Sequence, residues 1–281
     1  MFSLSVIVST YNSPRYLELV LRGLEAQTDR SFECIIADDG SGPGTEEVVE
    51  AFRRKLNIIH SWQADEGFRL AASRNRALAI AGGDLVAFLD GDCIPSPRYV
   101  ADIRETAAQA CGDAKSGAYL QGHRVILDAA MSVRSLNVGE IFAPGWIFRH
   151  RAHLSNKTNA LRFPFPLNRH SNLKGVRGCH MVFFAADLHA VNGFDEEFEG
   201  WGHEDRDLVR RLYRHGVDRI DLRGRAVIYH LYHPEHARDE ETENLSRAME
   251  ERPVRAGRGF RNSQCPRLRR ASSCRIHLTG S

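Results

Sequence analysis

The chain has 281 residues, 42% hydrophobic and 26% charged, which is the balance of a soluble globular protein with enough apolar residues to bury a large core. Its formal charge is +2, with eight Arg against one Glu from residue 251 onward, so the first 250 residues carry about −5 and give no general case for nucleic-acid binding. Six scattered cysteines without a CxxC pair, and an N-terminus without a charged or long apolar leader, argue against a secreted disulfide framework and predict a cytoplasmic protein.

Four β-α repeats follow one another over about the first 90 residues. Residues 4–10 form an almost fully apolar run, typical of a strand covered on both faces, and residues 15–27 carry apolar side chains at helical spacing after Pro14. The alternation continues with strand segments 32–41, 57–62 and 84–92 and helical segments 45–55 and 69–83. This order predicts a Rossmann-like α/β fold with a mostly parallel central sheet and helices on both faces.

Polar residues follow three of these strands, at 9–12, 38–41 and 90–92. Ligands of such sheets bind outside the carboxyl ends of the strands, so these segments predict the binding site. No GxGxxG follows the first strand and no GxxxxGK[ST] occurs, which argues against a dinucleotide oxidoreductase and a P-loop ATPase.

The remainder of the chain surrounds one irregular stretch. Residues 131–173 mix aromatic residues, prolines and bases without a clean period, and a loop of this length is usually functional or mobile. The predicted elements are helix 97–110, strand 117–127, a strand and a helix within 178–194, helix 201–216 and strand 225–236. The Arg-rich end is predicted to be a solvated, poorly ordered tail, although such a charge could also contact anionic lipid or a partner.

Asp90 and Asp92 stand two residues apart at the end of the fourth strand segment, separated by Gly91. Carboxylates this close repel each other and need a cation or a shared proton. Oxygen ligands from one or two carboxylates, completed by substrate phosphates, are the usual arrangement for Mg²⁺, and Mn²⁺ favours similar donors. The alternative is an Asp-Gly turn with surface acids, but the position at a strand end favours a metal site.

The last strand segment runs into three histidines, His230, His233 and His236. One of them could complete an octahedral site with the aspartates, phosphate oxygens and water. An HxxH spacing also occurs in zinc sites, but no Glu lies between the first two histidines as HExxH would require. Simple loop histidines are the competing interpretation for His233 and His236.

Glu204 and Asp205 fall at the predicted start of helix 201–216, where acids often serve only the helix dipole. Here Trp201 and Gly202 precede them. A Trp beside glycine can stack on a sugar face, and a neighbouring carboxylate can accept a proton from a hydroxyl nucleophile.

Taken together, the segments VIVSTYN, DDGS, GFRLAASRN, FLDGDCIPSP, NGFDEEFEGWGHEDRDL and IYH resemble the family 2 glycosyltransferases of GT-A fold. The similarity is greatest to bacterial chondroitin and hyaluronan polymerase domains and to the C-terminal part of β-1,4-galactosyltransferases. It spans residues 3–236, and the order and spacing of the motifs make it specific. His203 stands where relatives often carry Gly.

The resemblance implies a role for each matching residue. The implied nucleotide-binding residues are Ser9, Thr10, Tyr11, Asn12, Asp38, Asp39, Arg69 and Asp90, the last near the ribose or donor sugar. Asp92 is the implied metal ligand, with His230 as its C-terminal partner and His233 as the second choice. The implied acceptor and catalytic group is Trp201, Gly202, Glu204 and Asp205, with Asp205 the favoured base.

The resemblance further implies an enzyme that uses Mn²⁺ or Mg²⁺ to move a sugar from a UDP-sugar to a hydroxyl of a glycan or glycolipid, with inversion, in bacterial surface polysaccharide synthesis. Residues 1–95 would form the nucleotide-binding half, 96–250 the acceptor-binding and catalytic half, and 251–281 the tail. Peripheral attachment to the inner face of the membrane stays open. A retaining glycosyltransferase, a sugar nucleotidyltransferase and a non-catalytic sugar-binding module are the alternatives.

Overall fold

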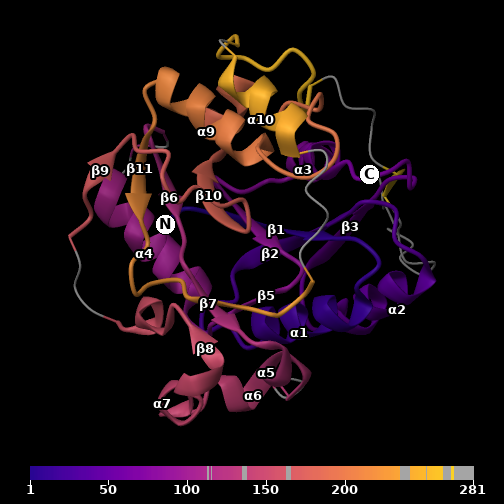
Figure 1. Ribbon diagram of the computed structural model, residues 1–281, viewed down its shortest axis with the longest axis vertical. Helices are drawn as coiled ribbons and strands as arrows, with labels where there is room; N and C mark the ends of the chain where they lie inside the picture. The colour runs from indigo at the N-terminus through magenta and orange to yellow at the C-terminus, as the bar shows by residue number, and fades with distance from the viewer. Residues whose placement is uncertain are drawn as a thin grey trace, which may run out of the picture.

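The computed structural model describes residues 1–112, 114, 116–134, 138–162, 166–234, 241–250, 252–261 and 267–268. Within these ranges the chain forms a nine-stranded sheet with helices on both faces and a second, four-stranded sheet (Figure 1). The order of the large sheet is β13-β3-β2-β1-β4-β10-β6-β11-β9. No helix in the described part of the chain is long and apolar enough to cross a membrane.

The predicted β-α repeats are confirmed. They consist of β1 (Leu4–Thr10), α1 (Pro14–Glu25), β2 (Phe32–Asp38), α2 (Pro43–Phe52), β3 (Ile58–Trp62), α3 (Leu70–Leu78) and β4 (Leu85–Asp90). The four strands are parallel. All seven residues of β1 are buried, because α1 and α2 cover one face of this part of the sheet and α3 covers the other.

The second half of the sheet is mixed and not mostly parallel. Its strands are β10 (His180–Phe184), β6 (Ala118–Gln121), β11 (Asp218–Asp221) and β9 (Arg169–His170). At the opposite edge of the sheet, β13 (Arg267–Leu268) pairs antiparallel with β3. β10 is antiparallel to both β4 and β6, whereas β11 is parallel to β6. The reversal means that β10 begins at the edge of the sheet where β4 ends. The covering helices here are α4 (Tyr99–Cys111), α8 (Ala185–Val191) and α9 (Glu204–Arg214), and α10 (Glu241–Met249) packs against α9.

The predicted strand 117–127 is two strands in two different sheets. It continues after β6 as β7 (Arg124–Leu127), which joins β5 (Cys93–Pro95), β12 (Ile228–His230) and β8 (Leu154–Ser155) in the small sheet. The break comes at Gly122, where a Cβ atom would lie 1.7 Å from the ring of the buried His180. Only a glycine lets the backbone cross this ring, and the crossing changes the direction of the strand.

Much of the stretch expected to be irregular is short helices. They are α5 (Ala129–Arg134), α6 (Val138–Ile141), α7 (Trp146–Arg149) and the 3₁₀ turns η1 (Arg151–His153) and η2 (Lys157–Ala160). Figure 1 shows α5, α6 and α7 gathered next to the small sheet at the bottom of the view. Trp146 and Leu154 pack there with Tyr229 of β12 in a separate apolar cluster.

Residues 252–261 differ from the expectation of a solvated tail, because they pack along α8. The N–H of Ala256 donates to the carbonyl of Val191 at 3.0 Å, and Asn192 Nδ2 donates to the carbonyl of Ala256 at 2.8 Å. The ring of Phe260 stacks on His189 with centroids 4.8 Å apart. The apolar residues among the arginines give this segment something to bury. The chain beyond residue 268 lies outside the described residues.

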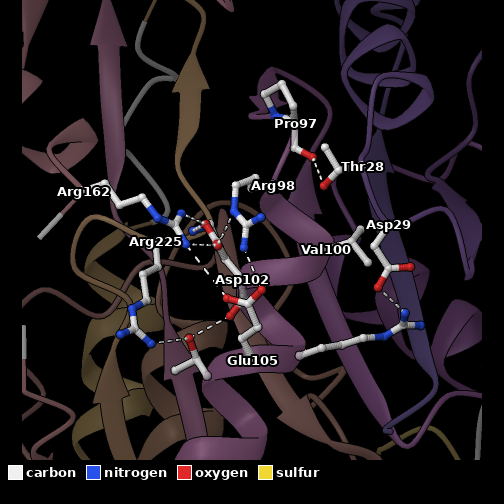
Figure 2. A network of polar contacts seen from close by, with 12 residues as sticks. Thr28, Asp29, Pro97, Arg98, Val100, Asp102, Glu105, Arg162 and Arg225 are labelled. Atoms are coloured by element: carbon white, nitrogen blue, oxygen red, sulfur yellow. Dashed lines mark hydrogen bonds and ion pairs between the residues drawn. The ribbon is translucent and has the colours of Figure 1, made fainter. Parts of the chain in front are cut away.

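A buried carboxylate on α4 anchors two distant segments (Figure 2). Asp102 accepts two hydrogen bonds from Arg162, at 2.8 and 2.9 Å, and one from the N–H of Ala226 at 2.9 Å. Arg98 of the preceding turn donates to it at 3.3 Å. Since Ala226 lies two residues before β12, this network fixes where β12 begins.

Replacing Asp102 should therefore destabilise the fold. In Asp102→Ala the buried N–H of Ala226 loses its acceptor and Arg162 loses both bonds, so we expect the free energy of unfolding to fall by about 2–3 kcal/mol. Chemical denaturation would measure it. Glu105→Ala, which removes an exposed acid that pairs with the same arginines, should change stability by less than about 0.5 kcal/mol. Equal losses in the two variants would refute the anchoring role.

Candidate active site

The ends of β1, β2 and β4 lie side by side at one edge of the sheet. Ser9 is opposite Asp90 across the β1–β4 ladder, and Thr10 is opposite Asp38 across the β1–β2 ladder. β10 starts at the same edge, where the N–H of Asp90 donates to the carbonyl of Cys179 at 3.3 Å. The segments singled out in the sequence therefore meet, as the Rossmann-like order predicts.

Gly91 is required by close packing. A Cβ atom at this position would lie 2.6 Å from the carbonyl oxygen of Ser9, a distance that real Cβ contacts do not reach. The turn between the two aspartates thus presses against the end of β1. Asp92 lies in this turn, and the chain then leaves the large sheet as β5.

The antiparallel ladder between β5 and β12 brings the predicted metal ligands together. His230 is opposite Cys93, and the N–H of Leu231 donates to the carbonyl of Asp92 at 2.9 Å. Asp92 Oδ2 lies 3.5 Å from His230 Nε2 and 3.1 Å from His233 Nε2. His230 and His233, the two candidates for the metal-binding histidine, thus both lie next to Asp92. His236 lies outside the described residues.

These three side chains can hold a cation, since one donor atom from each lies within 4.8 Å of the donor atoms of the other two. Nδ1 of His230 is also buried without a hydrogen-bond partner among the described residues. A carboxylate with two imidazoles suits Mn²⁺ better than Mg²⁺, which prefers oxygen ligands throughout. Zn²⁺ accepts the same donors.

Charge interactions within the cluster are strong. The hydrogen bond to Asp92 raises the pKa of His233 to about 9, whereas burial lowers the pKa of His230 to about 4 despite the nearby carboxylate. Burial would raise the pKa of Asp92, but the bond from His233 and the charge of His230 outweigh it and lower that pKa. A proton on His233 therefore occupies the place that a metal ion would take, and metal binding should release it.

Arg74 connects this edge to α9, and sequence reasoning missed it. Its guanidinium is 1% exposed and donates from Nε to Ser9 Oγ at 3.2 Å and from Nη2 to Asp90 Oδ1 at 2.8 Å. Nη1 donates to Glu204 Oε1 at 3.2 Å. The available signal was its place in GFRLAASRN, four residues after Leu70 and four before Leu78, on the face of α3 that packs against the sheet.

Arg74 stays charged although it is buried. Burial opposes its charge, but Asp90, Glu204 and Asp205 outweigh burial and raise its pKa. Burial also raises the pKa of Asp90, against the attraction of Arg74 and with the repulsion of Asp92. The pair thus satisfies Asp90 from inside the protein and leaves Asp92 as the aspartate that faces the two histidines.

The two acids at the start of α9 have different surroundings. Glu204 is buried against Arg74, and burial, with the charge of Asp205, raises its pKa to about 7. Asp205 is only half-buried, and its Cβ lies 3.4 Å from the place that a Cβ on Gly178 would take. Asp205 is therefore the acid that remains accessible at the sheet edge.

The loop before α9 has an unusual backbone. Gly202 and His203 both have left-handed conformations, with φ of 96° and 72°. This conformation is less favourable for a histidine than for a glycine. Trp201 is 38% exposed, and its carbonyl accepts a bond from Asn244 of α10. Trp201 is therefore an exposed aromatic residue four positions before Asp205 in the sequence.

The expected nucleotide-binding residues fall into two groups. Tyr11 is 46% exposed and donates to Asp65 at 2.9 Å, and Asp39 accepts the N–H of Arg69 at 2.7 Å. Both stand at the open end of β1 and β2. The guanidinium of Arg69 instead binds its own loop, at the carbonyl of Ala64 and the carboxylate of Glu66.

Asp38 and Asn12 are occupied by structural contacts. The carboxylate of Asp38 is buried, accepts the N–H of Ser41 at 2.8 Å and pairs with His60 at 2.8 Å. Asn12 has a left-handed backbone, and its side-chain oxygen accepts the N–H of Gly42 at 2.9 Å. These two residues shape the loops. Thr10 Oγ1 is buried without a partner among the described residues.

Two protein families match this chain. The family described as Glycosyl transferase family 2 matches residues 5–124, and the one described as N-terminal domain of galactosyltransferase matches residues 161–236. The chain carries a family 2 glycosyltransferase domain. The resemblance inferred from the sequence is confirmed: residues 5–124 match this family, and the relatives of the chain include glycosyltransferases.

Curated relatives of the family 2 domain include the validoxylamine A glucosyltransferase of Streptomyces hygroscopicus subsp. jinggangensis, 33% identical over 76% of this chain and 52% of the relative. The chondroitin synthase of Escherichia coli is 32% identical over 82% of this chain and 35% of its own length. The hyaluronan synthase of Pasteurella multocida is 30% identical over 76% and 23%. The chain thus spans about half, or less, of these relatives.

Solved structures share the fold. Staphylococcus aureus TarS matches with a TM-score of 0.63 at 21% identity, over 88% of this chain and 39% of TarS. The mannosyltransferase PcManGT of Pyrobaculum calidifontis, in complex with GDP-Man and Mn²⁺, matches with 0.57 at 18% identity, over 88% and 62%. These matches confirm the GT-A fold predicted from the sequence.

Removing Arg74 should destabilise the protein in a pH-dependent way. In Arg74→Ala, Asp90 and Glu204 stay buried without their cation, and breaking a buried pair typically costs about 3–5 kcal/mol. Arg74 lowers the pKa of both acids in the folded protein. Without Arg74 these pKa values rise further above those of the unfolded chain, so the folded protein binds more protons than the unfolded chain does. Stability then falls as pH rises, and the loss should be larger at pH 8 than at pH 5.

Urea denaturation at the two pH values measures this. Arg76→Ala, on the same helix, is the matched control and should change stability by less than about 0.5 kcal/mol at both pH values. A loss in Arg74→Ala that is the same at pH 5 and pH 8 would contradict the pairing with buried acids.

Proposed function

We propose that the protein transfers a sugar from a UDP-sugar to a hydroxyl group of a glycan or glycolipid, with a divalent metal and with inversion at the anomeric carbon. The observation that carries this is the cluster of Asp92, His230 and His233 beside the strand ends of a family 2 domain. Solved complexes of TarS contain UDP and UDP-GlcNAc, and that of PcManGT contains Mn²⁺, which supports a nucleotide-sugar donor and a metal.

The donor would lie along the sheet edge. Tyr11 and Asp39, which follow the ends of β1 and β2, would meet the base and ribose, and the diphosphate would extend toward Asp92. A metal ion held by Asp92 with His230 and His233 would supply positive charge to the leaving diphosphate. Asp90, already paired with Arg74, would face the ribose or the sugar.

Asp205 is the proposed base. The acceptor hydroxyl gives its proton to the Asp205 carboxylate while its oxygen bonds to C1 of the sugar and the bond from C1 to the diphosphate oxygen breaks. Attack from the opposite face inverts the configuration, so an α-linked donor gives a β-linked product. Glu204, held by Arg74, fixes the start of α9 and thereby the position of Asp205. Trp201 would stack on the acceptor.

The biological setting forms part of the proposal. Chondroitin and hyaluronan synthases among the relatives point to bacterial surface polysaccharide as the acceptor class. A cytoplasmic enzyme that meets its acceptor at the inner face of the membrane would fit this setting.

Loss of the metal ligand should abolish metal-dependent donor binding. In Asp92→Ala the cluster keeps two imidazoles but no carboxylate, so calorimetry should show that Mn²⁺ no longer strengthens UDP binding. Asp128→Ala is the matched control, because Asp128 also pairs with a histidine, His153, at 2.7 Å. This pair is exposed and lies in the small-sheet lobe, residues 124–160 around β7 and β8. Unchanged Mn²⁺ dependence in Asp92→Ala would remove the metal assignment.

Loss of the base should slow turnover without loss of the donor. We expect Asp205→Asn to lower the rate of sugar transfer by about 10²–10⁴-fold, because the acceptor proton has no acceptor group, while UDP affinity stays near that of the wild type. A panel of UDP-sugars with Mn²⁺, read first by UDP release without acceptor, identifies the donor. Asp218→Asn, at the start of β11, is the control.

The product decides between the remaining mechanisms. NMR of the product should show a β linkage from an α-linked donor. An α linkage would indicate a retaining enzyme, and pyrophosphate release from a nucleoside triphosphate would indicate a nucleotidyltransferase. Near-normal turnover in Asp205→Asn would exclude Asp205 as the base.

A further inference from the structure

The guanidinium of Arg124 lies near the metal cluster formed by Asp92, His230 and His233, but it has no role in the function proposed above. Arg124 begins β7, which runs parallel to β12, so that Arg124 is opposite Ile228 and Ile126 is opposite His230. Its Nη1 reaches to 3.9 Å from the thiol of Cys179. Because the carbonyl of Cys179 binds the N–H of Asp90, the tip of Arg124 lies close to the end of β4.

Arg124, which is half-buried, lacks the carboxylate partners that buried arginines such as Arg74 and Arg219 have. Arg74 has two carboxylates and Arg219 has Asp221, whereas no carboxylate of the described residues lies within 4.0 Å of the Arg124 guanidinium. The thiol contact is weak, and Nε is buried without any hydrogen-bond acceptor in the described part of the chain. A buried donor left unsatisfied costs about 1–3 kcal/mol, which a ligand that supplies an acceptor would recover.

The charge of Arg124 acts directly on the site. The largest influence on the pKa is burial for Asp90 and His230, and for His233 it is the hydrogen bond to Asp92. The charge of Arg124 also lowers the pKa of each of these three groups. The guanidinium is therefore near enough to Asp90 and to the two histidines for its charge to act on them.

Charge balance shows what the site lacks. A nucleoside diphosphate sugar brings two negative charges, and breaking the bond to the sugar adds a third to the diphosphate. A divalent ion together with Asp92 offsets only one of them. Arg74 cannot help, because Asp90 and Glu204 already neutralise it. Arg124 is a nearby cation whose charge remains available.

We propose that Arg124 binds the diphosphate of the nucleotide donor and stabilises the charge that develops on it as the sugar leaves. This rests on the proposed function, since it assumes a nucleotide-sugar donor at the metal cluster. A planar guanidinium can offer two N–H donors to phosphate oxygens, which a lysine ammonium cannot do in the same geometry. Arg124 would then be a catalytic residue, in direct contact with the substrate.

Two variants and a series of ligands test this. Arg124→Met removes the charge while keeping an apolar stem, and Arg124→Lys keeps the charge without the planar group. Calorimetry with saturating Mn²⁺ compares uridine with UDP, and turnover is measured with the UDP-sugar found active on the wild type. Arg151→Ala, an equal change of charge in the small-sheet lobe, is the control.

In Arg124→Met we expect at least a tenfold weaker UDP affinity, unchanged uridine affinity and about 10²–10³-fold lower kcat, with Arg124→Lys between it and the wild type. UDP affinity and kcat within twofold of the wild type would overturn the inference and leave the proposed function standing. Equal losses of uridine and UDP affinity in both variants would also overturn it, because the role would then be structural. A wild type that binds neither ligand would refute the proposed function as well.

Discussion

The buried contact of Arg74 with Asp90 and Glu204 is the interaction on which the site depends. It joins α3, the end of β4 and the start of α9, and it links the part of the chain that matches family 2 to the part that matches the galactosyltransferase family. A buried cation with two carboxylates repays its desolvation only if the geometry is held on all sides. The sheet, α3 and α9 supply that support, and the arrangement leaves Asp205 accessible.

A second connection brings the candidate metal ligands together. The ladder between β5 and β12 sets His230 beside Asp92, and the Asp102 network fixes the chain just before β12. Both connections join residues 92–102 to residues 226–231. Asp90 is thus held by Arg74 and Asp92 lies beside the histidines near β12, which explains why two aspartates so close in sequence can serve different neighbours.

The features predicted from the sequence are those encoded locally. The β-α repeats have clear periodicity, and Asp90, Asp92 and His230 stand at strand ends, where topology alone brings residues together. Arg74 was missed because an arginine does not stand out as a core residue in an Ala-rich helix, although its spacing from Leu70 and Leu78 places it on the sheet-facing side. The break at Gly122 depends on the ring of His180, which is far away in sequence. Helices of four residues, such as α6 and α7, are too short to show a period.

A divalent metal and a nucleotide diphosphate are proposed to meet at this edge of the sheet. A crystal grown with MnCl₂ and UDP, with data collected above and below the manganese absorption edge, would locate both. We expect one strong anomalous peak within bonding distance of Asp92 and at least one of His230 and His233, with the UDP diphosphate as a further ligand. Bound UDP whose phosphates lie away from Asp92, or a manganese peak elsewhere with this cluster empty, would refute the proposal.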